Sequence, residues 1–173
     1  MDDVEFDRKS FGNSFSIPIS LSTPEELSPV LYKLVFKATS RMRHKGYTAG
    51  GVHVAILYKD GCHWHKGEQF KYQMTYTPDI YKKAYRLLKQ TPYRNRVHAV
   101  AVSCFNLEKQ NTTQLDMFND IEKRNQITKA VDKINDKYGE FIITPARLLG
   151  YEKYVQDRVS FGGVKELEDF ITK

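Results

Sequence analysis

The sequence predicts an α+β fold: a two-layer β-α-β-β-α-β sandwich, with an antiparallel four-stranded sheet, two helices on one face and a C-terminal helical extension. Three observations lead to this class. Four segments carry the alternation or the β-branched and aromatic composition of strands. Two segments between them carry an apolar helical stripe bounded by start and stop signals. Their order along the chain is typical of a sheet with its helices on one side.

The first strand and the first helix occupy the N-terminal part of the chain. Apolar and polar residues alternate over 14–21, which predicts a half-buried strand. Thr23, Pro24 and Glu26 form a capping-box sequence that starts a helix, although a Ser-Pro pair shortly afterwards offers a second start. The helix should end at Gly46. Its apolar stripe consists of Leu27, Val30, Leu31, Leu34, Val35, Ala38 and Met42.

The central part of the chain holds the other strands and the second helix. Strands are predicted at 52–58, 69–76 and 97–107, with an Asp-Gly turn after the first of them. A Thr-Pro-Asp sequence at 77–79 starts the second helix, which stops before Pro92. In the strand at 69–76 the even positions should face the core. These are Phe70, Tyr72, Met74 and Tyr76.

The sheet face away from the helices should carry small and polar side chains with one cation. The residues expected there are Ser14, Ser16, Lys71, Gln73, Ala99, Ala101 and Ser103. Because few of these side chains are long, a polyanion can approach such a face closely.

A third helix is predicted directly after residue 118. Asn119 is its N-cap, Glu122 completes a capping box and Gly139 ends it. Its apolar stripe consists of Ile127, Ala130, Val131, Ile134 and Tyr138. The chain ends with a short amphipathic stretch that includes Val164, Leu167 and Phe170. The sequence leaves the role of this region open.

Composition limits the classes of protein. A length of 173 residues with 40% hydrophobic content fits one globular domain with an appendage. No apolar run approaches a membrane span, and the acidic first residues are unlike a signal peptide. Cys62 and Cys104 are too few for a disulfide framework, so we expect a cytoplasmic protein. The net charge of +6 favours a polyanionic partner.

The segment Gln114-Leu115-Asp116-Met117-Phe118 places three large apolar side chains in a polar stretch without strand or helix period. One interpretation is a loop that folds back and buries these side chains in its own domain. The other is a peptide that offers a glutamine and apolar anchors to the groove of another protein. The residues alone leave both interpretations open.

Several short segments together point to a known family. They are KSFGNSF at 9–15, TPDIY at 77–81, RVH at 96–98, FNL at 105–107, QLDMF at 114–118, INDKYG at 134–139 and FGG at 161–163. In this order the set resembles the little finger domain of bacterial Y-family lesion-bypass DNA polymerases of the DinB/UmuC type. The resemblance implies a reversed ferredoxin-like sheet.

The resemblance also implies a DNA-binding accessory domain that lies in the duplex major groove near the primer–template junction. Such a domain grips phosphates, which positions the duplex without reading its sequence. This chain departs from the family at Gln73 and His98, where a cation is more usual. The implied DNA contacts are Ser10, Gly12, Asn13, Ser14, Lys71, Gln73, Arg96 and His98.

For the segment at 114–118 the resemblance implies a peptide that binds the bacterial sliding clamp. Gln114 would fill a polar pocket, and Leu115, Met117 and Phe118 would fill an apolar groove around Asp116. Met117 stands where leucine is usual, a swap of similar volume that should cost under about 1.5 kcal/mol.

The catalytic part of such a polymerase is not recognisable in the chain. Two-metal phosphoryl transfer needs clustered carboxylates on a rigid sheet. We therefore expect a non-catalytic piece without a cofactor, with Mg²⁺ needed only in the catalytic domain of a parent polymerase that acts in translesion synthesis and the SOS response. The expected division is a leader at 1–9, the little finger at 10–108, a clamp-binding loop at 109–118 and a C-terminal helix and tail at 119–173. The expected partners are primer–template DNA, the sliding clamp and the rest of the polymerase chain, and no membrane.

Two other function classes remain. RNA-recognition motifs share the element order and carry a K/R-G-F/Y-G/A-F-V-x-F/Y sequence on the third strand. Residues 66–73 match this sequence only at Lys66, Gly67 and Phe70, and Phe70 is expected in the core. The second class is an interaction module that binds a clamp but no nucleic acid.

A cluster of His53, Cys62, His63 and His65 suggests a metal site. Tetrahedral metal sites are usually built from two spaced pairs of ligands, and no second pair is present. We therefore assign no metal.

Overall fold

The computed structural model describes residues 10–92, 95–109, 119–139, 141–143 and 145–148. The elements are β1 (Ser10–Ser16), α1 (Pro24–His44), β2 (Tyr47–Tyr58), β3 (His63–Met74), α2 (Thr77–Leu88), β4 (Val97–Lys109) and α3 (Asn119–Tyr138), followed by a short 3₁₀ helix, η1 (Ala146–Leu148). Within these ranges no helix is both long and apolar enough to cross a membrane.

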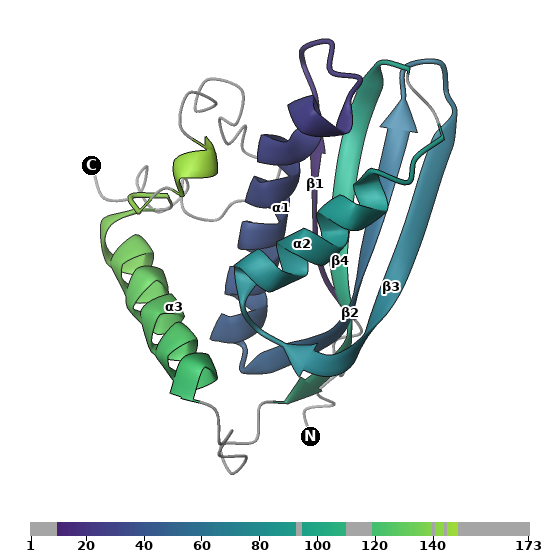
Figure 1. The fold of residues 1–173 in the computed structure, drawn as a ribbon. Helices are drawn as coiled ribbons and strands as arrows, with labels where there is room; N and C mark the ends of the chain where they lie inside the picture. Colours follow the sequence, from purple (N-terminus) through teal and green to yellow (C-terminus); the bar gives the residue numbers. More distant parts are fainter. Residues whose placement is uncertain (1–9, 93–94, 110–118, 140, 144, 149–173) are drawn as a thin grey trace, which may run out of the picture.

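The four strands form one antiparallel sheet in the order β1-β4-β2-β3. Each β-α-β unit is split, because β4 lies between β1 and β2, and β2 lies between β3 and β4. Both α1 and α2 lie on the same face of this sheet (Figure 1). The predicted α+β sandwich is therefore confirmed, and the sheet has the reversed ferredoxin-like arrangement that the resemblance implied.

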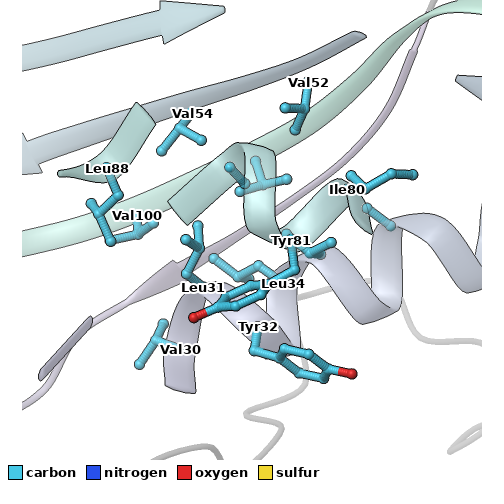
Figure 2. Close-up of a cluster of buried hydrophobic side chains, with 14 of the residues drawn as sticks. Val30, Leu31, Tyr32, Leu34, Val52, Val54, Ile80, Tyr81, Leu88 and Val100 are labelled. Atoms are coloured by element: carbon cyan, nitrogen blue, oxygen red, sulfur yellow. The ribbon is translucent and has the colours of Figure 1, made fainter. Parts of the chain in front are cut away.

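The core lies between the two helices and the sheet (Figure 2). It is filled by apolar side chains from every layer. Among those with an exposed fraction of 2% or less are Leu31, Leu34, Val52, Val54, Ile80, Leu88 and Val100. Burying a side chain of this size contributes about 1.5–3 kcal/mol relative to leaving it exposed, so this layer supplies the main stabilisation of the sandwich.

The predicted capping box of α1 is confirmed. The backbone N–H of Glu26 donates to Thr23 Oγ1 at 3.2 Å, and the Glu26 carboxylate accepts from the backbone N–H of Thr23 at 3.1 Å. The second possible start is wrong, since the helix continues through Pro29. Ser28 instead makes a hydrogen bond of 2.7 Å with the Tyr81 hydroxyl of α2.

The strand limits differ from the prediction. The structure has β1 at Ser10–Ser16 rather than at 14–21, β2 at Tyr47–Tyr58 rather than at 52–58, and β3 at His63–Met74 rather than at 69–76. Glycines such as Gly12 and Gly67, and the polar residues near them, hide the alternation of apolar residues in these strands. The backbone hydrogen bonds between strands form regardless of the side chains, so pairing extends past the recognisable pattern.

The prediction that Tyr72 faces the core is wrong. In β3, Gln69 pairs with Gly51 and Met74 pairs with Ala49, so residues 70–73 lie opposite the single residue Gly50. This bulge breaks the alternation, and Tyr72 is 78% exposed. Phe70 and Met74 are partly buried against the core as predicted.

The predicted apolar stripe of α3 does not pack into the core, because its residues face outward. Ile127 is 53% exposed and Tyr138 is 61% exposed, whereas Asp132 is buried. The reason is Arg43 of α1, whose Nε and Nη2 donate to the two carboxylate oxygens of Asp132 at 2.7 and 2.8 Å. The Arg43 Nη1 also donates to the backbone oxygen of Thr75 at 3.0 Å. A partly buried guanidinium needs these partners, and they fix the polar side of α3 against the domain.

The chain after α3 folds over α1. The Phe141 ring lies 4.9 Å from the Phe36 ring, centroid to centroid, and Leu148 is buried in the same core as α1. In Figure 1, α3 stands beside α1 on the side away from the sheet. The helical layer is thus covered in part by the C-terminal region.

We predict that Asp132→Asn lowers the free energy of unfolding by about 1–3 kcal/mol, because Arg43 would lose its charged partner while remaining partly buried. Urea denaturation measures this change. The matched control is Asp136→Asn, whose carboxylate pairs with the half-exposed His44 at 2.7 Å. The control should cost under about 1 kcal/mol. Equal losses in both variants would contradict the role given to the buried pair.

Candidate nucleic-acid interface

The sheet face opposite α1 and α2 carries mostly small side chains. The buried Val100, Val102 and Cys104 of β4 point to the helices, so Ala99, Ala101 and Ser103 lie on the other face. Strand register extends this face across the sheet. One row reads Gly12, Ser103, His53 and Gly67, and the next reads Ser14, Ala101, Ala55 and His65. The expected positions of Ser14, Ser16, Ala99, Ala101 and Ser103 on one face are confirmed.

A shallow depression of about 340 Å³ lies on this face, towards β1. Its lining residues are Gly12, Asn13, Ser14, His53, Ala101, Val102 and Ser103. A Cβ atom at Gly12 would lie 3.1 Å from the Val102 carbonyl oxygen and 3.2 Å from Ser103 Cβ. Any side chain at position 12 would therefore crowd the β4 backbone, and glycine keeps the strands close and the depression open.

Phe105 belongs to the same face, although the sequence did not point to it. A Cβ atom at Gly51 would lie only 2.5–2.9 Å from three atoms of the Phe105 ring, so the ring lies directly over this glycine. Asn106, at φ 50°, then interrupts the alternation of β4. As a result Cys104 and Leu107, three residues apart, both pack towards the core. The adjacent glycines at 50–51 were the available sequence signal for this close approach.

Lys71 and Gln73 lie on the bulge of β3, at one end of the sheet. Lys71 is exposed. The Gln73 amide is engaged within the domain: it accepts from Thr48 Oγ1 at 3.0 Å and donates to the Asn106 carbonyl oxygen at 3.3 Å. Lys71 therefore presents its ammonium to solvent, and Gln73 braces β3 against β2 and β4.

Arg96 and His98 lie at the opposite end of the sheet and are both exposed. His98 is the extra residue of a bulge, because Val97 and Ala99 pair with the consecutive residues Tyr58 and Leu57. Most of the length of β4 separates this end from Lys71. A 13-residue strand is about 40 Å long, so the structure does not bring all the implied DNA contacts together. It does gather Ser10, Gly12, Asn13 and Ser14 along one edge strand.

The histidines that had suggested a metal site lie on or beside the open face. His53 Nε2 and His65 Nδ1 are 3.2 Å apart, and the His63 ring is nearly parallel to that of His65, with 6.5 Å between centroids. Burial, and secondarily the nearby His65, lower the pKa of His53. In the described part of the chain no group of three or more His, Cys, Asp or Glu residues is arranged to hold a metal ion.

In an RNA-recognition motif the aromatic ring at the position of Phe70 would lie on the open face, but here it does not. This ring is partly buried against the core, and the Lys83 ammonium of α2 lies 5.9 Å from its centroid. Base stacking needs an exposed ring on the open face. The segment Gln114 to Phe118, expected to bind a clamp, lies outside the described residues between β4 and α3.

Comparison with known proteins assigns the chain to a family. Residues 8–117 match the impB/mucB/samB family C-terminal domain. The chain therefore belongs to this family, the little finger domains of Y-family lesion-bypass polymerases.

Individual relatives agree with this assignment. The chain is 29% identical to DNA polymerase IV of Bacillus anthracis, over 80% of this chain and 36% of the relative. It is 31% identical to DNA polymerase IV of Moorella thermoacetica, over 78% and 34% of the two chains. The chain thus spans about a third of the length of these curated relatives.

Solved structures share the fold. A Y-family DNA polymerase chimera superposes with a TM-score of 0.54 at 23% identity, over 60% of this chain and 30% of that one. DinB from Sulfolobus solfataricus superposes with a TM-score of 0.51 at 20% identity, over 58% and 29%.

We predict opposite titration shifts for two histidines, measurable by NMR of their ring protons. His53 should titrate below 6.5, mainly because burial disfavours its charged form, so its contribution to stability is present above 6.5 and is lost as the pH falls. His44 should titrate above 6.5, mainly because it is hydrogen-bonded to Asp136, so its contribution is present below 6.5 and is lost as the pH rises through the folded-state pKa.

Two substitutions separate the causes of these shifts. Asp136→Asn should remove most of the rise at His44. His65→Gln should raise the midpoint of His53 only in part, because burial, the larger cause, remains. A His53 midpoint at or above 6.5 in the unsubstituted protein would contradict the packing of this pair.

Proposed function

We propose that this chain is a non-catalytic DNA-binding and clamp-tethering domain of a translesion DNA polymerase. The observation that carries the proposal is the open sheet face, on which glycine, alanine and serine residues of β1 and β4 lie in register, with His53 and Ala55 of β2 beside them. A duplex can approach such a face until its phosphates contact the serine hydroxyls and, at the edge, the backbone N–H groups of β1. Phosphate contacts of this kind hold a duplex without reading its sequence.

The edge strand β1 adds donors to this face. It pairs with β4 on one side only, so backbone N–H groups on its outer edge have no partner strand within the sheet. Together with the hydroxyls of Ser10 and Ser14 they offer neutral donors to phosphate oxygens. The exposed cations Lys71 and Arg96 mark the two ends of the surface. Gly12 lets the phosphate backbone approach, and His98 adds an exposed polar side chain beside Arg96. Asn13 pairs with Val102, which faces the helices, and the Gln73 amide is bonded within the domain, so neither side chain is proposed as a phosphate contact.

The parent protein is proposed from the relatives. Those reported above are named DNA polymerase IV, and this chain corresponds to about a third of their length. We infer that the parent is a DNA-directed DNA polymerase whose Mg²⁺-dependent chemistry belongs to its catalytic part. This domain would then hold the product duplex while the catalytic part acts.

The segment Gln114 to Phe118 is proposed as the tether to the sliding clamp. It follows β4, the strand that contributes Ala99, Ala101 and Ser103 to the open face. A clamp-bound peptide at this place would raise the local concentration of the polymerase at DNA that already carries a clamp. The clamp would bring the polymerase to the DNA, and the sheet would orient the duplex.

We predict that Ser103→Glu weakens binding to a primed DNA duplex at least about tenfold, because a carboxylate in the centre of the open face would repel phosphates. Fluorescence anisotropy with labelled duplex measures the affinity. The matched control is Lys82→Gln, which also lowers the net charge by one but lies on α2, where the Lys82 side chain is 73% exposed. Equal weakening in both variants would show a dependence on net charge alone and would contradict a site on the sheet.

For the tether we predict that a Gln114→Ala, Leu115→Ala, Phe118→Ala triple variant no longer binds purified bacterial sliding clamp in a surface-bound clamp assay. Its melting temperature and its DNA affinity should not change, because the peptide is proposed to be an exposed ligand. A variant that instead melts well below the unsubstituted protein would place these side chains in the core of their own domain. That result would contradict the tether.

A further inference from the structure

The outward side of α3 is an apolar stripe that no described residue covers. Of the seven exposed large apolar residues in the described part of the chain, five lie on α3 or directly after it. They are Ile127, Ile134, Tyr138, Ile142 and Ile143, with exposed fractions of 53, 36, 61, 60 and 39%. Exposed apolar side chains gathered along one helix and the residues after it mark a contact surface.

The orientation of α3 is fixed by polar contacts on its other side. Asp132 is held by Arg43, and His44 Nε2 lies 2.7 Å from Asp136 Oδ2. Arg124, at the start of the helix, lies 3.5 Å from Asp79 of α2. Rotating the helix to bury its isoleucines would break these pairs and leave a guanidinium partly buried without its carboxylate. These contacts therefore keep the stripe facing outward, and the segment that covers it must lie outside the described residues.

The charges around the stripe select the chemistry of the occupant. Lys123 lies four residues before Ile127 and Lys137 three residues after Ile134, so both exposed lysines are neighbours of the stripe on the helix surface. The Lys137 ammonium lies 5.0 Å from the Tyr138 ring centroid. The carboxylates of Asp132 and Asp136 are committed to Arg43 and His44. A second copy of α3 would bring like charges together, whereas an acidic amphipathic segment would complement both the lysines and the isoleucines.

We propose that the occupant is residues 164–170 of the same chain. This stretch, VKELEDF, has apolar residues at every third position, a spacing that puts them on one side of a helical turn. They are Val164, Leu167 and Phe170. It also has three carboxylates against one ammonium, the charge that the lysines of α3 require.

The connection is long enough for this contact. Leu148, the last described residue, is buried against α1, close in the chain to the end of α3. Residues 149–163 can span up to about 50 Å when extended, and the 20-residue α3 is about 30 Å long. Any part of the stripe is therefore within reach. The contact depends on neither DNA nor clamp binding.

Hydrogen exchange of the α3 amides in the full chain, followed by mass spectrometry, tests the contact. Leu167→Ser with Phe170→Ser should speed exchange in α3 about tenfold and leave β2 and β4 unchanged. Unchanged exchange in α3 would overturn the proposal. Faster exchange throughout the sheet would also overturn it, because these side chains would then belong to the main core.

A charge exchange provides the matched control. Lys137→Glu and Glu168→Lys should each speed exchange in α3, and the double variant, which has the original net charge, should recover at least half of the loss. Additive losses in the double variant would overturn the pairing. Sedimentation of the unsubstituted chain should report a monomer. A dimer that Ile134→Ser dissociates would assign the stripe to a second copy and overturn the proposal.

Discussion

The position of β4 between β1 and β2 is the constraint on which the rest of the structure depends. It splits the first β-α-β unit, and the position of β2 splits the second in the same way. Crossover connections between parallel strands are right-handed. The crossover from β1 to β2 and the crossover from β3 to β4 start from strands that run in opposite directions, and they cross the sheet in opposite directions. Both helices therefore fall on the same face. The other face is left to small side chains, and this division between a core face and an open face makes a nucleic-acid surface possible.

The two ends of that surface are built differently from its centre. In the centre the register brings glycine, alanine and serine together, so the serine hydroxyls are accessible. At the ends, bulges in β3 and β4 interrupt the pairing and turn Lys71 and His98 to solvent. Bulges re-aim side chains because they bend the strand and increase its local twist. A flat centre with cations at its margins is the distribution expected for holding a duplex through its phosphates.

Sequence reasoning succeeded where local chemistry decides the structure and failed where long-range pairing does. The capping box at Thr23 and Glu26 and the alternation that puts Ala99, Ala101 and Ser103 on one face act within a few residues, and both were predicted. The exposure of Tyr72 depends on which residue of β2 lies opposite, which no local pattern contains. The same holds for α3, where Arg43, distant in sequence, fixes Asp132 inward and leaves the predicted apolar stripe exposed. Of the candidate site, the small residues of β1 and β4 were predictable, whereas Phe105 over Gly51 required the register.

The central claim is that the open face holds duplex DNA through a few phosphates. Its most direct test is the affinity of the unsubstituted chain for a primed duplex as a function of salt concentration. If about three to five phosphates are neutralised, the logarithm of the association constant should fall with the logarithm of the salt concentration with a slope of about −3 to −4. An affinity that does not change with salt, or a preference for single-stranded RNA over the primed duplex, would contradict the account.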